Sequence, residues 1–389
     1  KMKTPAGADP DPDRRAALQA NYGVPAGSCF ATGEELLAQP RLADVMIIAT
    51  QDRQHVAQAL AALDKGYHLV LEKPISPLLD ECLALQKKAH EANRVVVVCH
   101  VLRYTKFYGT LYELLRGGAI GRIESLDAVE NVAYWHYAHS YVRGNWRRAE
   151  ESSPMILAKC CHDMDILSWL LGSRCRTVSS FGDLRYFREE NAPAGSPARC
   201  TDGCPHSGSC PYYAPALYLD DNTPWPTALT ALGPDQSYEA RKKALEEGPY
   251  GKCVFHNDND VVDHQVASLL FENGTTVAFT MCAFSDACDR TVKFMGTRGE
   301  IRASMDNNVI EVTQFGAGVR TGTTAVYTVK PGSTGHSGGE FVSILKGERE
   351  NTNTIAQSVH SHVMAFAAEE SRLTGRTVDV ADFEKSVMA

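Results

Sequence analysis

Three apolar runs in the first hundred residues alternate with helical patterns. Val45-Met-Ile-Ile-Ala49 and Tyr67-His-Leu-Val-Leu71 are separated by a stretch of helical spacing, from His55 to Lys65. A third run, Val95-Val-Val-Val-Cys99, has no polar interruption, which predicts a strand buried on both faces. Strand, helix and strand in this order build a parallel sheet.

The segments around these runs add two helices and one strand. Ser76-Pro77 is typical of a helix start, with serine as N-cap and proline at the first helical position, so we expect a helix from there to Asn93. Residues 1–8 can form a strand that ends at Asp9. The acidic residues from Asp11 onward favour a helix start, although Asp9 and Asp11 could serve only as helix caps.

The second half of the chain has the alternation of a different sheet. A strand is predicted at residues 121–131, and later strands at 260–271, 275–282, 290–295 and 309–313, with an Asn273-Gly274 hairpin turn. Their sequence order predicts a meander, hence a mostly antiparallel sheet with helices on one face. Helices are expected at 107–116, 154–172 and 356–373.

Composition limits the class of protein. The chain has 389 residues, 44% hydrophobic and 22% charged, which suits two domains of a globular enzyme. A net charge of −8 disfavours nucleic acid as the main partner. No apolar run approaches the roughly 20 residues that span a bilayer, and no signal peptide is visible. The scattered cysteines are typical of reduced thiols in a cytoplasmic protein.

Lys73 follows the second apolar run directly, where open α/β sheets bind ligands. On spacing alone it is equally well a solvated cation at a helix start. The order Ala49-Thr50, His55 and Glu72-Lys73-Pro74, however, resembles the glucose–fructose oxidoreductase, inositol dehydrogenase and MocA family (Gfo/Idh/MocA) of NAD(P)-dependent oxidoreductases. The resemblance covers nearly the whole chain.

The resemblance implies a fold and a domain plan. We expect an N-terminal Rossmann-type parallel sheet over residues 1–100, and a C-terminal α+β domain with a large, mostly antiparallel open sheet over residues 101–389. Residues 190–255 would be an insertion, and the helix at 355–375 would pack back on the first domain. No Gly-x-Gly-x-x-Gly turn occurs in the chain, so we expect that the natural first strand, glycine turn and helix are missing from it.

The resemblance also implies the cofactor-binding residues. The lysine of the Glu-Lys-Pro motif, Lys73, would lie between nicotinamide and substrate. Asp9, at the tip of the family's second strand, would bind the ribose hydroxyls and favour NAD over NADP. The expected cofactor-binding set is Asp9, Thr50, His55, Glu72, Lys73, His100 and Arg103, the last followed by Tyr104 as a substrate-binding residue.

The helix expected at 154–172 carries the second group of catalytic candidates. Lys159, His162 and Asp163 are three and four residues apart, so they would share one face. A solvated stripe with a Lys159–Asp163 salt bridge is the plainer alternative. In the family this helix carries an aspartate and, four residues later, a histidine; the histidine matches His162, whereas the aspartate position is Ala158. We therefore expect Lys159 to take the missing polar role.

Residue chemistry assigns the roles. Oxidising a secondary alcohol needs a base near neutral pKa, and histidine suits this without tuning. We expect His162 to be that base or acid and Lys73 to hold the substrate oxygen, or the reverse. Hydride transfer itself belongs to the cofactor.

A polar and aromatic segment precedes that helix. Such a mixture suits a carbohydrate pocket, in which hydrogen-bonding groups lie beside flat rings, but it also suits an ordinary amphipathic loop. His264 is one of two adjacent polar residues on a predicted strand, and the run His336–Glu340 is a weaker candidate for a loop at the same pocket. The expected substrate-binding set is Tyr104, Asn131, His136, Arg143, Trp146, Asp163 and His264.

Cysteines cluster in the Gly- and Pro-rich insertion. Cys200, Cys204 and Cys210 lie close together and suit tetrahedral thiolate binding of a structural zinc ion, with Cys253 as the expected fourth ligand. His206 or His256 could replace Cys253. An iron–sulfur cluster, free thiols or one disulfide are alternatives.

The sequence therefore indicates a cytoplasmic NAD(P)-dependent oxidoreductase. Its expected substrate is a secondary alcohol of a sugar, glycoside or cyclic polyol, and a homo-oligomer, dimer or tetramer, is expected from the resemblance. Two alternatives remain: a glycoside-cleaving enzyme that uses NAD transiently, and a non-catalytic sensor or binding protein of the same fold.

Overall fold

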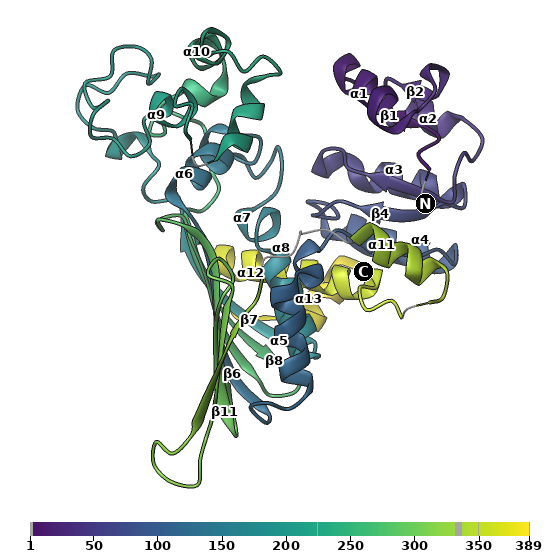
Figure 1. The fold of residues 1–389 in the computed structure, drawn as a ribbon, viewed down its shortest axis with the longest axis vertical. Helices are drawn as coiled ribbons and strands as arrows, with labels where there is room; N and C mark the ends of the chain where they lie inside the picture. The colour runs from purple at the N-terminus through teal and green to yellow at the C-terminus, as the bar shows by residue number, and fades with distance from the viewer. Residues whose placement is uncertain (1–2, 224, 331–336, 349, 389) are drawn as a thin grey trace. The chain divides into compact units, whose positions relative to one another are not determined.

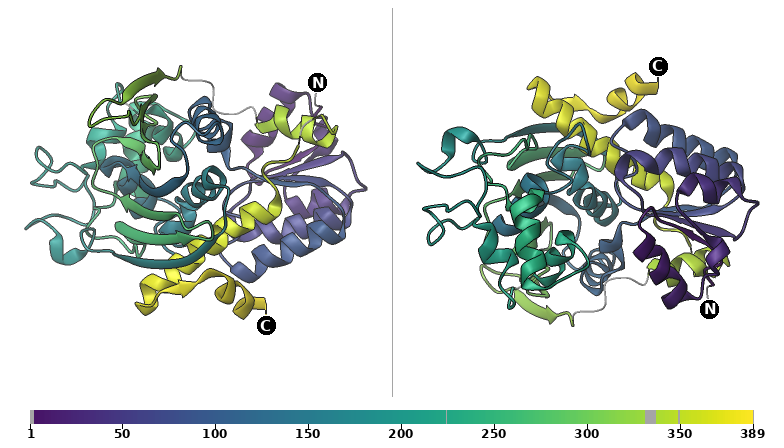
Figure 2. Two further views of the ribbon diagram at one scale, coloured as in Figure 1. Left: turned by 90° about the horizontal axis from the view of Figure 1, so that it is seen from below. Right: turned by 90° about the horizontal axis from the view of Figure 1, so that it is seen from above.

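The computed structural model describes residues 3–223, 225–330, 337–348 and 350–388, and the chain divides into two compact units. Unit 1 holds the residues up to Thr105, a segment that ends at Val363, and the C-terminal residues from Glu384. Unit 2 holds residues from Lys106 onward and the segment Met364–Phe383. Figures 1 and 2 trace the elements of each unit.

Unit 1 contains two parallel sheets. Strands β3, β4 and β5 pair in that order, and β1 pairs with β2 in a separate two-stranded sheet. The elements are β1 (Gly7–Ala8), α1 (Pro12–Tyr22), β2 (Cys29–Phe30), α2 (Gly33–Ala38), β3 (Val45–Ile48), α3 (His55–Asp64), β4 (His68–Leu71), α4 (Leu79–Glu91), β5 (Val96–Val98), α11 (Ser337–Leu345) and the first part of α12 (Ile355–Thr374).

The three-stranded sheet has the buried core that the apolar runs predict. Val96, Val97 and Val98 of β5 are all buried, which confirms a strand covered on both faces. Helices α3 and α4 contribute Ala59, Leu63 and other buried apolar side chains. Burying such side chains stabilises the sheet by about 1.5–3 kcal/mol for each large one.

The start of α4 was predicted three residues too early. Ser76 does not cap the helix at its first turn; the helix begins at Leu79. Ser76 Oγ instead accepts a hydrogen bond from Leu78 N–H at 3.1 Å and donates to Glu81. Serine thus organises the turn before the helix, because a short hydroxyl side chain bonds readily to nearby groups on its own chain.

Unit 2 is built on a nine-stranded sheet in the order β13-β12-β11-β10-β6-β9-β8-β7-β14. Most pairs are antiparallel, as predicted. The strands are β6 (Ile123–Val132), β7 (Cys175–Asp183), β8 (His264–Phe271), β9 (Thr276–Cys282), β10 (Cys288–Gly296), β11 (Gly299–Ser304), β12 (Val309–Gln314), β13 (Thr323–Thr328) and β14 (Val378–Asp379).

The predicted meander order is wrong at one place. Strand β6, the first in sequence, lies between β9 and β10 and runs parallel to β9. Alternation along a strand reports which residues face the core, not which strand lies beside it. The prediction also missed β7, β11, β13 and β14; β13 is exposed at every position, so it has no alternation to detect.

Helices cover one face of this sheet. Asp163 of α8 bonds to Arg290 of β10, which fixes α8 on that face, and α5 contacts α8 (Figure 1). The helices of unit 2 are α5 (Lys106–Arg116), α6 (Tyr134–Tyr137), α7 (Met155–Ala158), α8 (Cys161–Leu171), α9 (Ala214–Tyr218) and α10 (Tyr238–Glu247), with the later part of α12 and the start of α13 (Val380–Met388), as far as Phe383. No helix of the described residues is long and apolar enough to cross a bilayer.

Candidate functional site

The carboxyl ends of three neighbouring strands in unit 1 carry the predicted cofactor residues. Thr50 follows β3, Glu72-Lys73 follows β4, and His100 follows β5. Because these strands are parallel and adjacent in the order β3-β4-β5, their ends lie along one edge of the sheet. This edge is where open α/β sheets bind ligands.

His55 joins two of these strand-end loops. It is 1% exposed; Nδ1 lies 2.8 Å from the carbonyl oxygen of Pro74, and Nε2 lies 3.0 Å from that of Thr50. Both partners are acceptors, and a neutral imidazole can donate to only one of them. Through these two contacts, His55 connects the loop that carries Lys73 and Pro74 to the loop that carries Thr50.

A second histidine, not predicted from the sequence, holds the same loop. His362 Nε2 accepts a hydrogen bond from Ile75 N–H at 2.9 Å, so the ring proton is on Nδ1, which donates to Ser358 O at 2.7 Å. His362 is fully buried on α12. A polar residue at a buried position of a helix predicts a hydrogen-bond partner, so the sequence could have indicated that His362 has one. It could not have identified Ile75 as that partner.

The residues after β5 are fixed in a similar way. The Arg103 guanidinium is buried and donates to Thr352 O at 2.6 Å. Asn353 Nδ2 donates to Val98 O at 2.9 Å and to Tyr104 Oη at 3.1 Å. The loop before α12 therefore packs against the end of β5, and Arg103 and Tyr104 hold that loop in place by hydrogen bonds.

Glu72 is half-buried beside Cys99. Burial, and then the nearby Glu72 carboxylate, raise the pKa of the Cys99 thiol to about 12. Glu72 Oε2 also accepts the backbone N–H of Lys73 at 3.2 Å. The carboxylate thus orients the backbone at Lys73, while the thiol stays protonated at neutral pH.

Asp9 lies one residue past β1, as expected. Its Oδ1 accepts Asp11 N–H at 2.9 Å, and Arg14 Nη1 lies 3.8 Å from Oδ2. Asp11 caps α1 by accepting Asp13 N–H at 2.8 Å, so the capping alternative describes Asp11 well. The Asp9 side chain is 26% exposed, so the carboxylate is partly open to solvent.

In unit 2 the helix predicted over residues 154–172 is interrupted. It divides into α7 and α8, and Lys159 and Cys160 lie between them. The prediction that Lys159 shares one helix face with His162 and Asp163 is therefore wrong. His162 is half-buried in the first turn of α8.

Lys159 pairs with a residue that the sequence analysis missed. Its Nζ lies 3.4 Å from Oε1 of Glu130, which points from β6 into the core and is 1% exposed. Arg290 Nε lies 2.8 Å from Glu130 Oε2, and its guanidinium donates to both carboxylate oxygens of Asp163, at 2.9 and 3.3 Å. Two cations and two carboxylates thus form one buried network.

Burial raises the pKa of Glu130 to about 7, against the lowering effect of the Arg290 guanidinium, while Asp163 adds to the rise. The missed signal was the alternation of β6: Leu126, Ala128 and Val132 face the core, and Glu130 has the same parity. A carboxylate at a core position predicts a buried partner.

The polar-aromatic segment is mostly buried. His136 Nδ1 lies 3.3 Å from Cys288 Sγ, and its ring stacks with that of Trp135. His139 packs among aromatic rings and bonds to Tyr218 Oη at 2.7 Å; burial, and then the Arg143 charge, lower the pKa of His139 to about 4.

The other predicted substrate residues separate into two groups. Asn131 and Trp146 are half-buried, and His264 Nδ1 lies 2.6 Å from Asp263 Oδ1. Arg143 is 2% exposed and points into the cysteine insertion, where Nε donates to Lys252 O and Nη2 to Tyr212 O, both at 2.8 Å. His336 lies outside the described residues, and α11 begins at Ser337, so a loop at 337–340 is a wrong prediction.

All four cysteines of the predicted metal set line one small cavity in unit 2, together with His206. All twelve cysteines of the chain are free thiols. Among the described residues, no group of three ligating side chains stands at metal-binding spacing.

Comparison with known proteins decides the family. The sequence model described as "Oxidoreductase family, NAD-binding Rossmann fold" matches residues 3–100, and the one described as "Oxidoreductase family, C-terminal alpha/beta domain" matches residues 112–380. The chain belongs to the Gfo/Idh/MocA oxidoreductase family. The predicted family, fold class and enzyme class are thereby confirmed.

Individual relatives are distant. YteT of Bacillus subtilis, named as an oxidoreductase, is 25% identical over 76% of this chain and 69% of its own length. Inositol 2-dehydrogenase 4 of Saccharopolyspora erythraea is 28% identical over 48% of this chain and 51% of its own length. A solved structure from Desulfitobacterium hafniense, described as an NADPH-dependent oxidoreductase, has a TM-score of 0.70 at 16% identity and covers 99% of this chain and 92% of that one.

Proposed function

We propose that this Gfo/Idh/MocA protein is a dehydrogenase that transfers hydride between a nicotinamide cofactor and a secondary alcohol of a sugar, glycoside or cyclic polyol. The observation that carries the proposal is the row of residues after three parallel strands: Thr50, Glu72-Lys73 and His100. The inositol 2-dehydrogenase relative supports the substrate class.

The residues of unit 1 suit the two ends of a dinucleotide. Asp9 places a partly exposed carboxylate at the end of β1, which suits ribose hydroxyls and repels a 2′-phosphate. Lys73 stands at the strand edge on a loop fixed by His55 and His362. No Gly-x-Gly-x-x-Gly run is present in the chain, so no residues are assigned to the pyrophosphate.

The bound nicotinamide would supply the hydride chemistry, and the chain's own residues would manage the proton and the oxygen. Lys73 is proposed to hold the substrate oxygen and stabilise its charge. His162 is proposed to take the hydroxyl proton, a role that typically contributes about 10²–10⁴-fold to the rate. Lys159 is proposed to act through Glu130, with which it is paired, rather than directly on the substrate.

The experiment is a titration with NAD and with NADP, followed by an absorbance assay for NADH with a panel of sugars, glycosides and inositols. We expect NAD to bind more tightly than NADP. The Desulfitobacterium hafniense protein is described as NADPH-dependent, so preference for NADP would refute the role proposed for Asp9. The same assays on a chain extended at its N-terminus would show how much the affinity for NAD depends on residues outside the given sequence.

Each outcome points to one function. Net NADH formation supports the dehydrogenase. Tight NAD that never exchanges, with cleavage of a glycoside and no net NADH, would support the transient-redox enzyme instead. Absence of NAD and NADP binding in both chains would overturn the proposal in favour of a binding protein.

We also propose that the protein is a homo-oligomer that pairs through the sheet face opposite the helices. Phe181 and Val266, on β7 and β8, are 68% and 44% exposed, and Val326 of β13, paired with exposed Glu311 of β12, is exposed on the same face. A second copy of the same sheet is the partner that would cover them. Light scattering during size-exclusion chromatography should give the mass of a dimer or tetramer, and Phe181→Asp should reduce it.

A further inference from the structure

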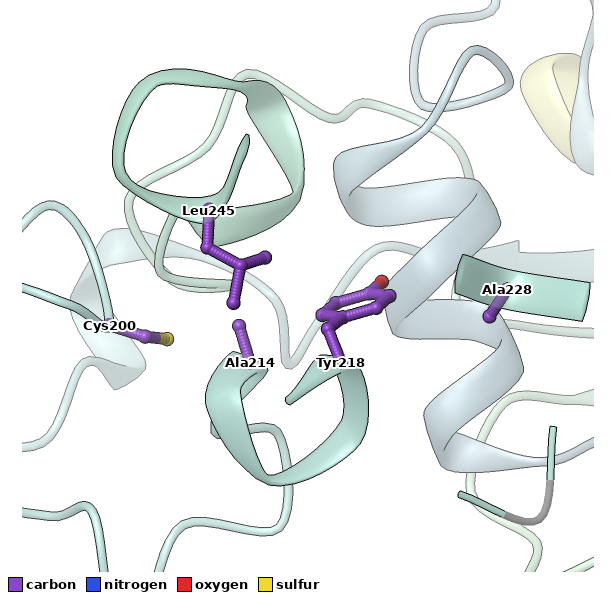
Figure 3. Close-up of a cluster of buried hydrophobic side chains, with 5 residues drawn as sticks. All are labelled: Cys200, Ala214, Tyr218, Ala228 and Leu245. Atoms are coloured by element: carbon purple, nitrogen blue, oxygen red, sulfur yellow. The ribbon is translucent and has the colours of Figure 1, made fainter. Parts of the chain in front are cut away.

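The insertion that carries the cysteines has a small core of its own. Cys200, Ala214, Tyr218, Ala228 and Leu245 form this cluster, drawn in Figure 3. Its regular elements are short: α9 has five residues and α10 has ten. Small cores with short elements usually need a further cross-link, such as a disulfide or a metal ion.

The segment around Cys200 and the segment around Cys253 lie side by side in the insertion. Cys200 N–H donates to Gly251 O at 2.9 Å, and Cys253 N–H donates to Ala198 O at 2.8 Å, around an antiparallel bridge between Arg199 and Lys252. The remaining two cysteines are joined by a tight turn, in which Ser207 N–H donates to Cys204 O and Cys210 N–H to His206 O. Residues far apart in the sequence thus meet at one point.

The cavity between these segments has room for one ion. Its volume is about 10 Å³, close to the minimum that holds a single water. A four-iron cluster with its sulfides would need more space. Cys200, Cys204, Cys210 and Cys253 all line the cavity, whereas His256 does not, and His256 Nε2 lies 3.2 Å from Ser196 O. His206 also lines the cavity, but its Nε2 lies 2.8 Å from Ala194 O. The fourth ligand is therefore Cys253 rather than either histidine.

Backbone N–H groups point at two of these sulfurs. Tyr212 N–H bonds to the sulfur of Cys210, and the N–H groups of Phe255 and His256 bond to that of Cys253. Hydrogen bonds of this kind hold metal-binding side chains in place.

A buried cation lies beside the same sulfurs. Arg143 Nη2 is 3.7 Å from Cys200 Sγ, and no carboxylate of the described residues lies within ion-pair distance of Arg143. Its other bonds go to two carbonyl oxygens. A buried arginine is costly without an opposite charge, and a tetrathiolate zinc centre has a net charge of −2.

We propose that Cys200, Cys204, Cys210 and Cys253 bind one structural Zn²⁺ as thiolates, with Arg143 as the buried counter-cation. Binding releases four thiol protons and changes no oxidation state. The thiols turn into the cavity to reach the ion, since they do not stand at ligand spacing without it. The ion would tie the insertion to the segment that carries Arg143.

The test is metal analysis of the full chain, purified under reducing conditions without chelator. We expect about one zinc per chain by mass spectrometry, and after exchange with Co²⁺ the intense visible and near-ultraviolet bands of a tetrahedral cobalt thiolate. Cys204→Ser and Cys210→Ser should lose the metal. Cys282→Ser is the matched control, because Cys282 is a half-buried cysteine on β9 outside the cavity.

The wild-type result alone can overturn the proposal, even if a variant fails to fold. Purification without metal together with no cobalt bands would refute it, as would a disulfide between two of the four cysteines. Iron with inorganic sulfide would also refute zinc. A cobalt spectrum unchanged in Cys204→Ser would exclude the proposed ligand set. Because metal content is measured without NAD or substrate, these results are independent of the proposed dehydrogenase activity.

Discussion

Arg290 lies directly opposite Glu130 across the β6–β10 pair, with Nε 2.8 Å from Oε2. The same guanidinium holds Asp163 of α8. One buried arginine therefore links two strands of the sheet and the helix that carries His162. Removal of one partner from such a network is costly, because it leaves the others as uncompensated buried charges.

The raised pKa of Glu130 gives stability a defined pH dependence. Between its ordinary value of 4.5 and about 7, the folded protein holds a proton that the unfolded chain has lost. The free energy of unfolding should therefore decrease as pH rises through this window, by on the order of 3 kcal/mol from this group. Glu130→Gln should remove that contribution and flatten the curve from urea unfolding. Glu124→Gln, at an exposed position of β6, is the control; equal slopes in all three proteins would contradict the prediction.

Lys73 is expected to matter for turnover more than for cofactor binding. Lys73→Met should reduce kcat by about 10²–10⁴-fold, with the NAD dissociation constant changed much less, because the loop is fixed from below by His55 and His362. Stopped-flow and steady-state kinetics give the change in kcat, and calorimetric titration with NAD gives the change in the dissociation constant. Lys87→Met changes an exposed lysine of α4 and should leave both quantities unaltered. A Lys73 variant with normal turnover would show that the residue is only a surface cation.

His362 is expected to be a stabilising residue. His362→Ala leaves the Ile75 N–H buried without its partner, which should cost about 1–3 kcal/mol, whereas Ser358 O keeps its hydrogen bond from Ser361 Oγ. His90→Ala, at an exposed position of α4, should change the free energy of unfolding by less than about 0.5 kcal/mol. Equal effects of the two substitutions on denaturant unfolding would argue against the hydrogen bonds.

The charge of Arg143 should control metal affinity. Arg143→Leu is expected to weaken zinc binding by about 10–100-fold, as removal of groups around a metal's ligands commonly does. Arg143→Lys keeps the positive charge and should weaken zinc binding less than Arg143→Leu does. Competition with a chromophoric chelator measures the zinc affinity of both variants. Arg148→Leu alters a nearby arginine that pairs with Glu151 and Asp258 instead, so its zinc affinity should remain that of the wild type.

Local pattern was enough to place the parallel strands and Lys73 at the end of β4. Strands and strand ends depend on side-chain periodicity within a few residues, and this periodicity can be read from the sequence alone. The break between α7 and α8 could not be foreseen, because the spacing from Met155 to Leu171 is helical throughout. The break places Lys159 beside Glu130, a contact with another element that no local window contains.

Partners across long sequence distances were also out of reach. Asn353 and Val98 are 255 residues apart, yet one hydrogen bond joins them. Glu130 could have been recognised as buried from the alternation of β6, but its partner Arg290 could not. In the cysteine insertion, the sequence grouped the four cysteines that line one cavity, but it assigned Arg143, which lies beside Cys200, to the substrate instead. Metal binding there stays a prediction.

The position of β6 between β9 and β10 has a consequence for the order of events during synthesis. Residues of β6 bond to β9 residues that are made 151 positions later. At about 5–20 residues per second, β6 waits on the order of 10–30 s for its neighbours. Chains rich in such distant pairings fold slowly, so the sheet of unit 2 should complete late, and the backbone groups of β6 need shielding while the rest of the chain emerges.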